Sequence, residues 1–283
     1  MQQENNKFLN MFLASKDIEG CSSRTIKYYQ DILSKFIEYI DKSIKDITTD
    51  DIRIYFSFYK ENSTCNAVTM DNIRRVFSSF FAWLEDEDYI LKSPVRRIHR
   101  VKTATVVKET LTDENIEKLR DGCLHIRELV IIELLISTGI RIGELVNLNI
   151  TDIDFEDRSC IVLGKGNKQR EVYFDARTKI HLKQYLNTRT DNEEALFVSK
   201  IKPYHRMTIS AIESIIRNLG KNMNIKKVHP HKFRRTMATM AIDKGMPIEQ
   251  VQKLLGHTKI DTTMHYAMVN QANVKFSHRK YMS

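Results

Sequence analysis

Near its C-terminal end the chain reads LLGHTKIDTTMHY over residues 254–266. Tyr266 follows His257 by nine positions, and a His-x-x-Arg pattern, His231 to Arg234, lies upstream. A tyrosine in this setting predicts a nucleophile directed at a phosphodiester. Taken alone, Tyr266 is one of eleven tyrosines, and packing in a core is the simpler interpretation. The rest of the chain decides between these readings.

The charge of the chain is concentrated in one region. The 283 residues suit two domains and carry a net charge of +9. Residues 1–100 hold 15 basic and 15 acidic side chains, whereas residues 200–235 hold ten basic side chains and one acid, Glu213. So one-sided a stretch favours nucleic acid as the partner over an ordinary solvated surface.

Several classes of protein are disfavoured by the sequence. The four cysteines, Cys21, Cys65, Cys123 and Cys160, are far apart, which indicates neither a zinc site nor a disulfide framework. The N-terminus is polar, without the apolar core of a signal peptide, and no apolar run is long enough to span a membrane. We therefore expect a cytoplasmic protein that makes no membrane contact.

The N-terminal region, residues 1–97, reads as a bundle of four amphipathic helices. A short helix is expected around Phe8 to Leu13, a second after an N-cap at Ser22 or Ser23, a third capped by Thr49, and a fourth around Ile73 to Leu84. The basic segment that follows lacks helical periodicity, and we place an interdomain linker at residues 98–109. It is expected to lie along DNA phosphates.

The C-terminal region, residues 110–283, reads as a helical domain with a small antiparallel sheet. Thr112 is the expected N-cap of its first helix, and an apolar helix over 129–136 ends near Gly139. Strands are expected over 159–163 and 169–174, joined by a turn at 164–168. Further helices are expected at about 175–187, 207–220, 231–244, 248–255 and 259–269, with a tail from about 268. The fold class is thus mainly α with a small antiparallel β-sheet.

Cleavage of a phosphodiester without a metal requires a particular set of side chains. Two arginines clamp the nonbridging oxygens, and a general acid protonates the leaving oxygen. Arg141 and Arg234 are the candidate clamp, with Glu144 positioned on the same helical face to orient Arg141. The acid is Lys165 or its neighbour Lys168, and His231 and His257 are further candidates.

Each of these features also has a simpler interpretation. An isolated Arg-x-x-Glu is more often a structural pair, and a lysine in a turn is usually solvated. The histidines His229, His231, His257 and His265 suggest a zinc site as an alternative, but no cysteine joins them and the surroundings are cationic, which disfavours a dication. We therefore expect neither a metal nor a cofactor.

The order of these motifs is more specific than any one of them. The blocks are GIRIGEL (139–145), GKGNK (164–168), HKFRRTMAT (231–239), LLGHT (254–258) and TTMHY (262–266). Together they resemble the tyrosine recombinase (phage integrase-type) family, in particular Xer-like recombinases and mobile-element integrases without an arm-binding domain. The resemblance covers the whole chain. It implies an N-terminal SAM-like core-binding domain followed by an α/β catalytic domain.

The resemblance implies a role for each site residue. Arg141 and Arg234 would clamp the scissile phosphate, Lys165 would protonate the leaving 5′-hydroxyl, and His231 would act as acid or base. His257 would hydrogen-bond a nonbridging oxygen, and Tyr266 would attack to form a 3′-phosphotyrosyl link. Arg235 and Phe233 depart from residues frequent in the family. The candidate DNA contacts are Arg74, Arg75, Arg96, Arg97, Arg100, Lys102, Lys168, Arg206, Lys226, Lys227, Lys232 and Arg235.

The resemblance also implies partners. These are double-stranded DNA, further copies of the chain in a homotetramer on paired sites with exchange of the C-terminal tail, and an accessory directionality factor. The protein would be associated with the nucleoid and encoded by a bacterium, a phage or a mobile element.

The alternative functions are a type IB-like topoisomerase or resolvase, a catalytically silent DNA-binding regulator on the same fold, and a metal nuclease. Integration and excision, inversion, and dimer resolution all remain open, as does delivery of Tyr266 in cis or in trans.

Overall fold

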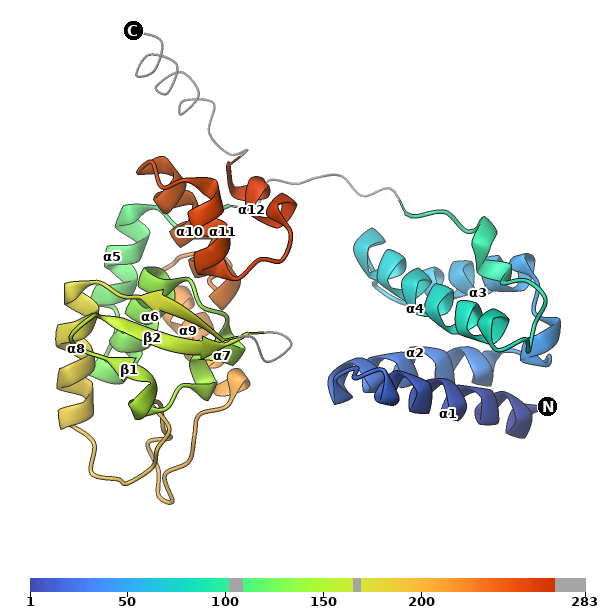
Figure 1. Cartoon of the computed structure of the whole chain (residues 1–283), viewed down its shortest axis with the longest axis horizontal. Helices are drawn as coiled ribbons and strands as arrows, with labels where there is room; N and C mark the ends of the chain where they lie inside the picture. The colour runs from blue at the N-terminus through green and yellow to red at the C-terminus, as the bar shows by residue number, and fades with distance from the viewer. Residues whose placement is uncertain (102–108, 165–168, 268–283) are drawn as a thin grey trace, which may run out of the picture. The chain divides into compact units, whose positions relative to one another are not determined.

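A computed structural model describes residues 1–101, 109–164 and 169–267, except the side chains of His265 and Ala267. The chain divides into two compact units, Met1–Val106 and Val107–Ser283. The division falls within the segment expected to be a linker. Each unit is described by itself below (Figure 1).

The N-terminal unit is a helical bundle. Its helices are α1 (Gln2–Ile18), α2 (Ser23–Tyr39), α3 (Thr49–Glu61) and α4 (Ala67–Asp86), with single 3₁₀ turns η1 (Ile44–Asp46) and η2 (Pro94–Arg97). Aromatic side chains fill its core, and those with no exposed surface include Phe12, Phe36, Phe77, Phe80 and Phe81. The apolar spacing read from the sequence therefore identified the core-facing sides of these helices.

Two helix starts in this unit differ from expectation. The first helix is 17 residues long rather than short, because polar residues flank its apolar stripe on both sides without a breaker. The N-cap of α3 is Thr48, not Thr49. The Thr48 hydroxyl accepts from the Asp51 backbone N–H at 3.3 Å, and an Asp51 carboxylate oxygen accepts from the Thr48 N–H at 2.9 Å. This reciprocal pair selects Thr48 over its neighbour.

The C-terminal unit packs helices around a three-stranded sheet. It opens with α5 (Asp113–Asp121), capped by Thr112 as expected, and continues with α6 (Ile126–Thr138) and α7 (Ile142–Asn147). The antiparallel sheet follows the 3₁₀ turn η3 (Ile150–Asp152) and has the order β1 (Ile153–Asp154), β2 (Ser159–Leu163) and β3 (Gln169–Tyr173). The later helices are α8 (Ala176–Asn187), α9 (Ile209–Asn222), α10 (Pro230–Asp243), α11 (Ile248–Leu255) and α12 (Ile260–Ala267).

The predicted elements of this unit are confirmed, apart from small shifts at their ends. Two short elements were not expected: α7, whose six residues are too few for a helical period, and β1, whose two residues are too few for an alternating pattern. The apolar helix α6 is buried on nearly all sides and packs against α8, α10 and β3. Figure 1 shows α10, α11 and α12 gathered at one end of the unit. No helix in the described part of the chain is long and apolar enough to cross a membrane.

Two glycines end the helices that lead into the candidate site. Gly139 follows α6 with φ of 62°, and Gly256 follows α11 with φ of 64°. This left-handed conformation is costly for residues with a Cβ. At Gly139 a Cβ would also lie 2.0 Å from the terminal methyl of Met237. Both turns thus require glycine, and each directs the chain into a cluster of cationic side chains.

Candidate active site

Segments distant in sequence converge at the C-terminal ends of α6 and α11. Arg141 follows the Gly139 turn, Arg170 comes from β3 and Arg234 from α10. His257 follows the Gly256 turn, and Tyr266 is on α12, which packs against α10 and α11. The structure therefore brings together four of the six predicted catalytic residues, Arg141, Arg234, His257 and Tyr266.

Arg234 lies at the centre of this cluster. Its side chain is buried, with 3% of its surface exposed. The guanidinium donates to the backbone oxygens of Gly139 at 2.7 Å and Leu255 at 2.6 Å, and to Nε2 of His257 at 3.0 Å. Burial and then the charge of Arg141 lower the pKa of Arg234, but it remains a cation at neutral pH. Arg234 thus joins the ends of α6 and α11.

Arg141 and Glu144 are paired, but not because they share a helical face. Arg141 is the N-cap of α7, outside its helical turns. Glu144 Oε2 accepts from the Arg141 backbone N–H at 2.7 Å, and Oε1 accepts from Arg141 Nη1 at 2.9 Å. Burial by itself would raise the pKa of Glu144, but hydrogen bonds from Arg170 and Arg141 outweigh it and the pKa is lowered. Glu144 is therefore ionised at neutral pH, and it orients Arg141 through the helix cap.

The hydrogen bonds of His257 determine its tautomer. A guanidinium only donates, so Nε2 of His257 accepts from Arg234. The proton is then on Nδ1, which donates to the hydroxyl of the fully buried Thr263 at 2.9 Å. Burial, and then the charges of Arg234 and Arg141, lower the pKa of His257 to about 4. The imidazole is neutral at neutral pH.

We expect His257 to titrate near pH 4 in the protein without DNA, rather than near the ~6.5 of an exposed histidine. Between these values the unfolded chain binds a proton that the folded chain does not, so acidification through this window lowers the free energy of unfolding. Nitrogen-15 NMR of the ring measures the midpoint, and His257→Gln assigns the signal. A midpoint near that of an exposed histidine would contradict the buried, arginine-bonded geometry.

Tyr266 lies beside His257. The two rings are stacked, with centroids 6.0 Å apart and planes 29° apart. The Tyr266 ring also packs against an apolar cluster made by Met237, Ala238, Val251 and Leu255. Core packing and a reactive role are therefore compatible at this position, because the ring is held while the residue stays partly exposed.

Of the other two predicted catalytic residues, Lys165 and His231, the structure describes only His231. Lys165, like the rival Lys168 and the linker residue Lys102, lies outside the described residues. His231 is in the first turn of α10, one turn before Arg234, and its side chain is exposed. Their predicted roles stay predictions.

Three of the predicted DNA contacts are engaged within the protein, and their contact with DNA stays a prediction. Lys232 is buried and donates to the Lys226 carbonyl at 3.1 Å. Arg206 donates to the Val146 and Leu148 carbonyls at 2.8 and 3.0 Å, which ties it to the chain after α7. Arg74 is largely buried against Asp71, with 2.9 Å between Nε and the carboxylate. The basic count of residues 200–235 therefore overstates the exposed positive charge.

Of the remaining described candidates, one is partly buried and six are exposed. Arg235 is partly buried and donates to the Glu109 carbonyl at 2.7 Å. The exposed ones are Arg75, Arg96, Arg97, Arg100, Lys226 and Lys227. The guanidinium of Arg75 pairs with Asp71 through Nε and that of Arg96 pairs with Glu85 through Nη2, and both side chains stay exposed.

Arg170 is the site residue that the sequence reading missed. It donates to both oxygens of Glu144, at 2.7 and 2.8 Å, and is nearly buried. The signal was the alternation of strand β3, in which Arg170 lies on the same inward side as Val172. A charged residue at an inward position of a strand requires a buried partner of opposite charge.

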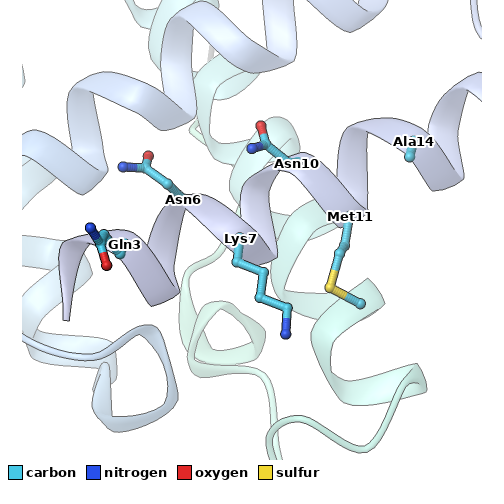
Figure 2. A pocket seen from close by; sticks show the side chains of 6 residues that line it. All are labelled: Gln3, Asn6, Lys7, Asn10, Met11 and Ala14. Atoms are coloured by element: carbon cyan, nitrogen blue, oxygen red, sulfur yellow. The ribbon is translucent and has the colours of Figure 1, made fainter.

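Each unit has a surface cavity. The one on the N-terminal unit lies along one side of α1, as Figure 2 shows, and its volume is about 520 Å³. Its lining is mostly amide and aliphatic, which offers no set for acid–base chemistry: Gln3, Asn6, Lys7, Asn10, Met11 and Ala14. A larger cavity of about 1110 Å³ lies beside the candidate site, between α10, α11 and β3. Within the described ranges no group of three or more His, Cys, Asp or Glu could hold a metal ion.

Comparison with known proteins places both units in one protein family. The profile described as "Phage integrase family" matches residues 108–273, and "Phage integrase, N-terminal SAM-like domain" matches residues 8–91. The tyrosine recombinase XerC of Oceanobacillus iheyensis is 30% identical, over 96% of this chain and 95% of its own.

Two solved structures of recombinases align with this chain over nearly its whole length. A crystal structure of XerA recombinase is 28% identical and aligns with a TM-score of 0.57 over 99% of both chains. The Tn1549 transposon integrase, in complex with a circular intermediate DNA, aligns with a TM-score of 0.78 over 98% of this chain and 99% of its own. At 19% identity the second structure is evidence of shared fold alone.

Proposed function

This chain belongs to the phage integrase family of tyrosine recombinases, and from that premise we propose that it breaks and rejoins DNA at specific sites through Tyr266. The observation that carries the proposal is the convergence of Arg141, Arg234 and His257 beside the Tyr266 ring. Because these side chains come from different elements, the folded chain assembles a cationic cluster next to a tyrosine.

The proposed reaction follows from this cluster. Arg141 and Arg234 bind the nonbridging oxygens of a DNA phosphate and stabilise the charge that develops on them. The Tyr266 oxygen attacks phosphorus and gives its proton to His231, directly or through water. The bond from phosphorus to the 5′-oxygen breaks, and the leaving oxygen takes a proton from Lys165. A 3′-phosphotyrosine and a free 5′-hydroxyl result, and attack by a 5′-hydroxyl reverses the step without hydrolysis.

The tautomer of His257 bears on this mechanism. Nε2 of His257 accepts from Arg234, so it has no proton to give a phosphate oxygen. An incoming phosphate would take over a donor of Arg234, and its negative charge would raise the pKa of His257. We propose that phosphate binding thereby converts His257 into a donor.

We propose that the exposed arginines of the N-terminal unit and the lysines before α10 contact DNA phosphates. Arg75, Arg97 and Lys227 represent these groups, and all three are exposed. Such contacts would set the position of the protein on DNA without reading bases, so binding would weaken as salt rises.

We also propose a homotetramer on paired sites, in which the tail after residue 267 docks on a neighbouring protomer. In support, the larger cavity is partly lined by Met237, Met240, Ala241, Met246 and Leu254, which suit apolar side chains. The tail itself lies outside the described residues and carries Val274, Phe276 and Tyr281. An accessory directionality factor, a mobile-element origin and a place at the nucleoid belong to the same proposal.

Covalent capture tests the proposed function without a known target site. Wild-type protein is incubated in chelator with nicked duplexes of randomised sequence, and detergent-resistant complexes are recovered and sequenced. We expect enrichment of one sequence class, which then supplies the duplex for kinetics. Relaxation of plasmid that lacks this sequence would favour a topoisomerase, binding without adducts would favour a regulator, and loss of all activity in chelator would favour a metal nuclease.

A further inference from the structure

One carboxylate in the C-terminal unit serves two arginines. Arg170 donates to Glu144 Oε1 at 2.7 Å and to Oε2 at 2.8 Å, a bidentate pair. Arg141 donates to the same two oxygens, from its side chain at 2.9 Å and its backbone at 2.7 Å. The Glu144 side chain is 4% exposed, so these bonds replace the water it loses on burial.

Arg170 also holds the turn that carries His257. Its Nε donates to the Leu254 carbonyl at 3.0 Å, at the end of α11. Its side chain lies against Gly256, where an added Cβ would come within 3.0 Å of Arg170 Cδ. One guanidinium thus connects β3, the start of α7 and the chain just before His257.

The two arginines differ in how far they can reach a substrate. The Arg141 side chain is 34% exposed, whereas that of Arg170 is 12% exposed with its known bonds directed into the protein. We propose that Arg170 is a positioning residue for strand cleavage, which holds Glu144 so that Arg141 stays available to the phosphate. This inference rests on the proposed function of Arg141.

The physical reason lies in what Glu144 would do without Arg170. A buried carboxylate that loses its bidentate partner takes its replacement from the nearest guanidinium, and that is Arg141. Arg141, which already donates to Glu144 from Nη1, would then give Glu144 a second side-chain donor and have fewer donors left for the phosphate. The Leu254 carbonyl would lose its donor at the same time, which loosens the turn before His257.

The test uses the full chain and the duplex recovered by covalent capture. Arg170→Met removes the fork and the charge, and Arg170→Lys keeps the charge without the fork. Arg177→Met is the matched control, because Arg177 is an exposed arginine of α8 paired with Glu117. For each variant the rate of single-turnover adduct formation, the DNA dissociation constant and the thermal midpoint are measured.

We expect Arg170→Met to slow adduct formation roughly 10- to 100-fold, with the dissociation constant nearly unchanged, and Arg170→Lys to be slowed by a smaller factor. Arg177→Met should cleave at the wild-type rate. Adding Glu144→Gln to Arg170→Met should slow cleavage little further, since both changes act on the same contact to Arg141. A purely structural role would instead lower the thermal midpoint while leaving the cleavage rate of the folded protein unchanged.

Wild-type cleavage rates in both Arg170 variants would overturn the inference. If Arg170→Met does not fold, Arg170→Lys decides: slowed cleavage with unchanged binding supports the inference, and the wild-type rate overturns it. Failure of the proposed function looks different, because then the wild-type protein itself forms no adduct through Tyr266.

Discussion

Replacing Tyr266 with phenylalanine is expected to abolish the covalent protein–DNA adduct. The DNA dissociation constant should change by no more than about twofold, which is less than the loss of one hydrogen bond would cause. The substitution removes one oxygen and keeps the ring, which packs on Leu255 and stacks with His257. The folded unit should therefore persist without its nucleophile. Denaturing electrophoresis of the captured duplex, labelled in turn at each end, measures the adduct and its polarity.

Tyr173→Phe is the matched control for this prediction. Tyr173 is an exposed tyrosine on β3 whose hydroxyl donates to Glu171 at 2.8 Å. We expect this variant to form the adduct like the wild type, with a free 5′-hydroxyl on the released strand. An adduct that persists in Tyr266→Phe, mapped by mass spectrometry to another residue, would reject Tyr266 as the nucleophile.

Replacing Arg234 with lysine is expected to slow adduct formation about 10²- to 10³-fold, the effect of losing one fixed donor to the developing charge. Lysine keeps a positive charge but not the planar fork that now reaches Gly139, Leu255 and His257. A buried carbonyl left without a donor should also lower the free energy of unfolding by roughly 1–3 kcal/mol. Single-turnover kinetics and urea denaturation measure the two effects separately.

Arg217→Lys controls for the change of side chain at an exposed arginine, on α9. We expect its cleavage rate and stability to match the wild type, because exposed substitutions rarely exceed about 0.5 kcal/mol. The Arg234 prediction is wrong if Arg234→Lys is destabilised as expected yet cleaves at the wild-type rate below its unfolding transition. That outcome would leave Arg234 a structural brace between α6 and α11.

Much of the fold was predictable because local rules act on local sequence. The apolar spacing of α2, α4 and α9 and the caps at Ser22 and Thr112 each depend on residues within a few positions. The exceptions have local causes too. At α3 the reciprocal bond between Thr48 and Asp51 competes with Thr49, and β1 is too short for its pattern to be seen.

The candidate site was predictable only in part, because charge patterns do not reveal burial. The sequence treats Lys232 and Lys227 alike, yet one is buried against the Lys226 carbonyl and the other is exposed. Arg206, a predicted DNA contact, donates to the backbone carbonyls at and after the end of α7, which its sequence position did not indicate. Which cations face a partner depends on contacts with distant segments, and a linear pattern does not contain them.

By itself, the sequence determined the family and its candidate residues, since the ordered blocks from Arg141 to Tyr266 are a linear property of the chain. Tertiary structure alone decided how those residues work together. It brought Arg170 onto Glu144 across 26 residues, Arg234 onto the Gly139 carbonyl across 95, and His257 into a neutral tautomer. The reason is physical: burial and the close approach of like charges change hydrogen bonds and pKa values only when distant segments meet in space.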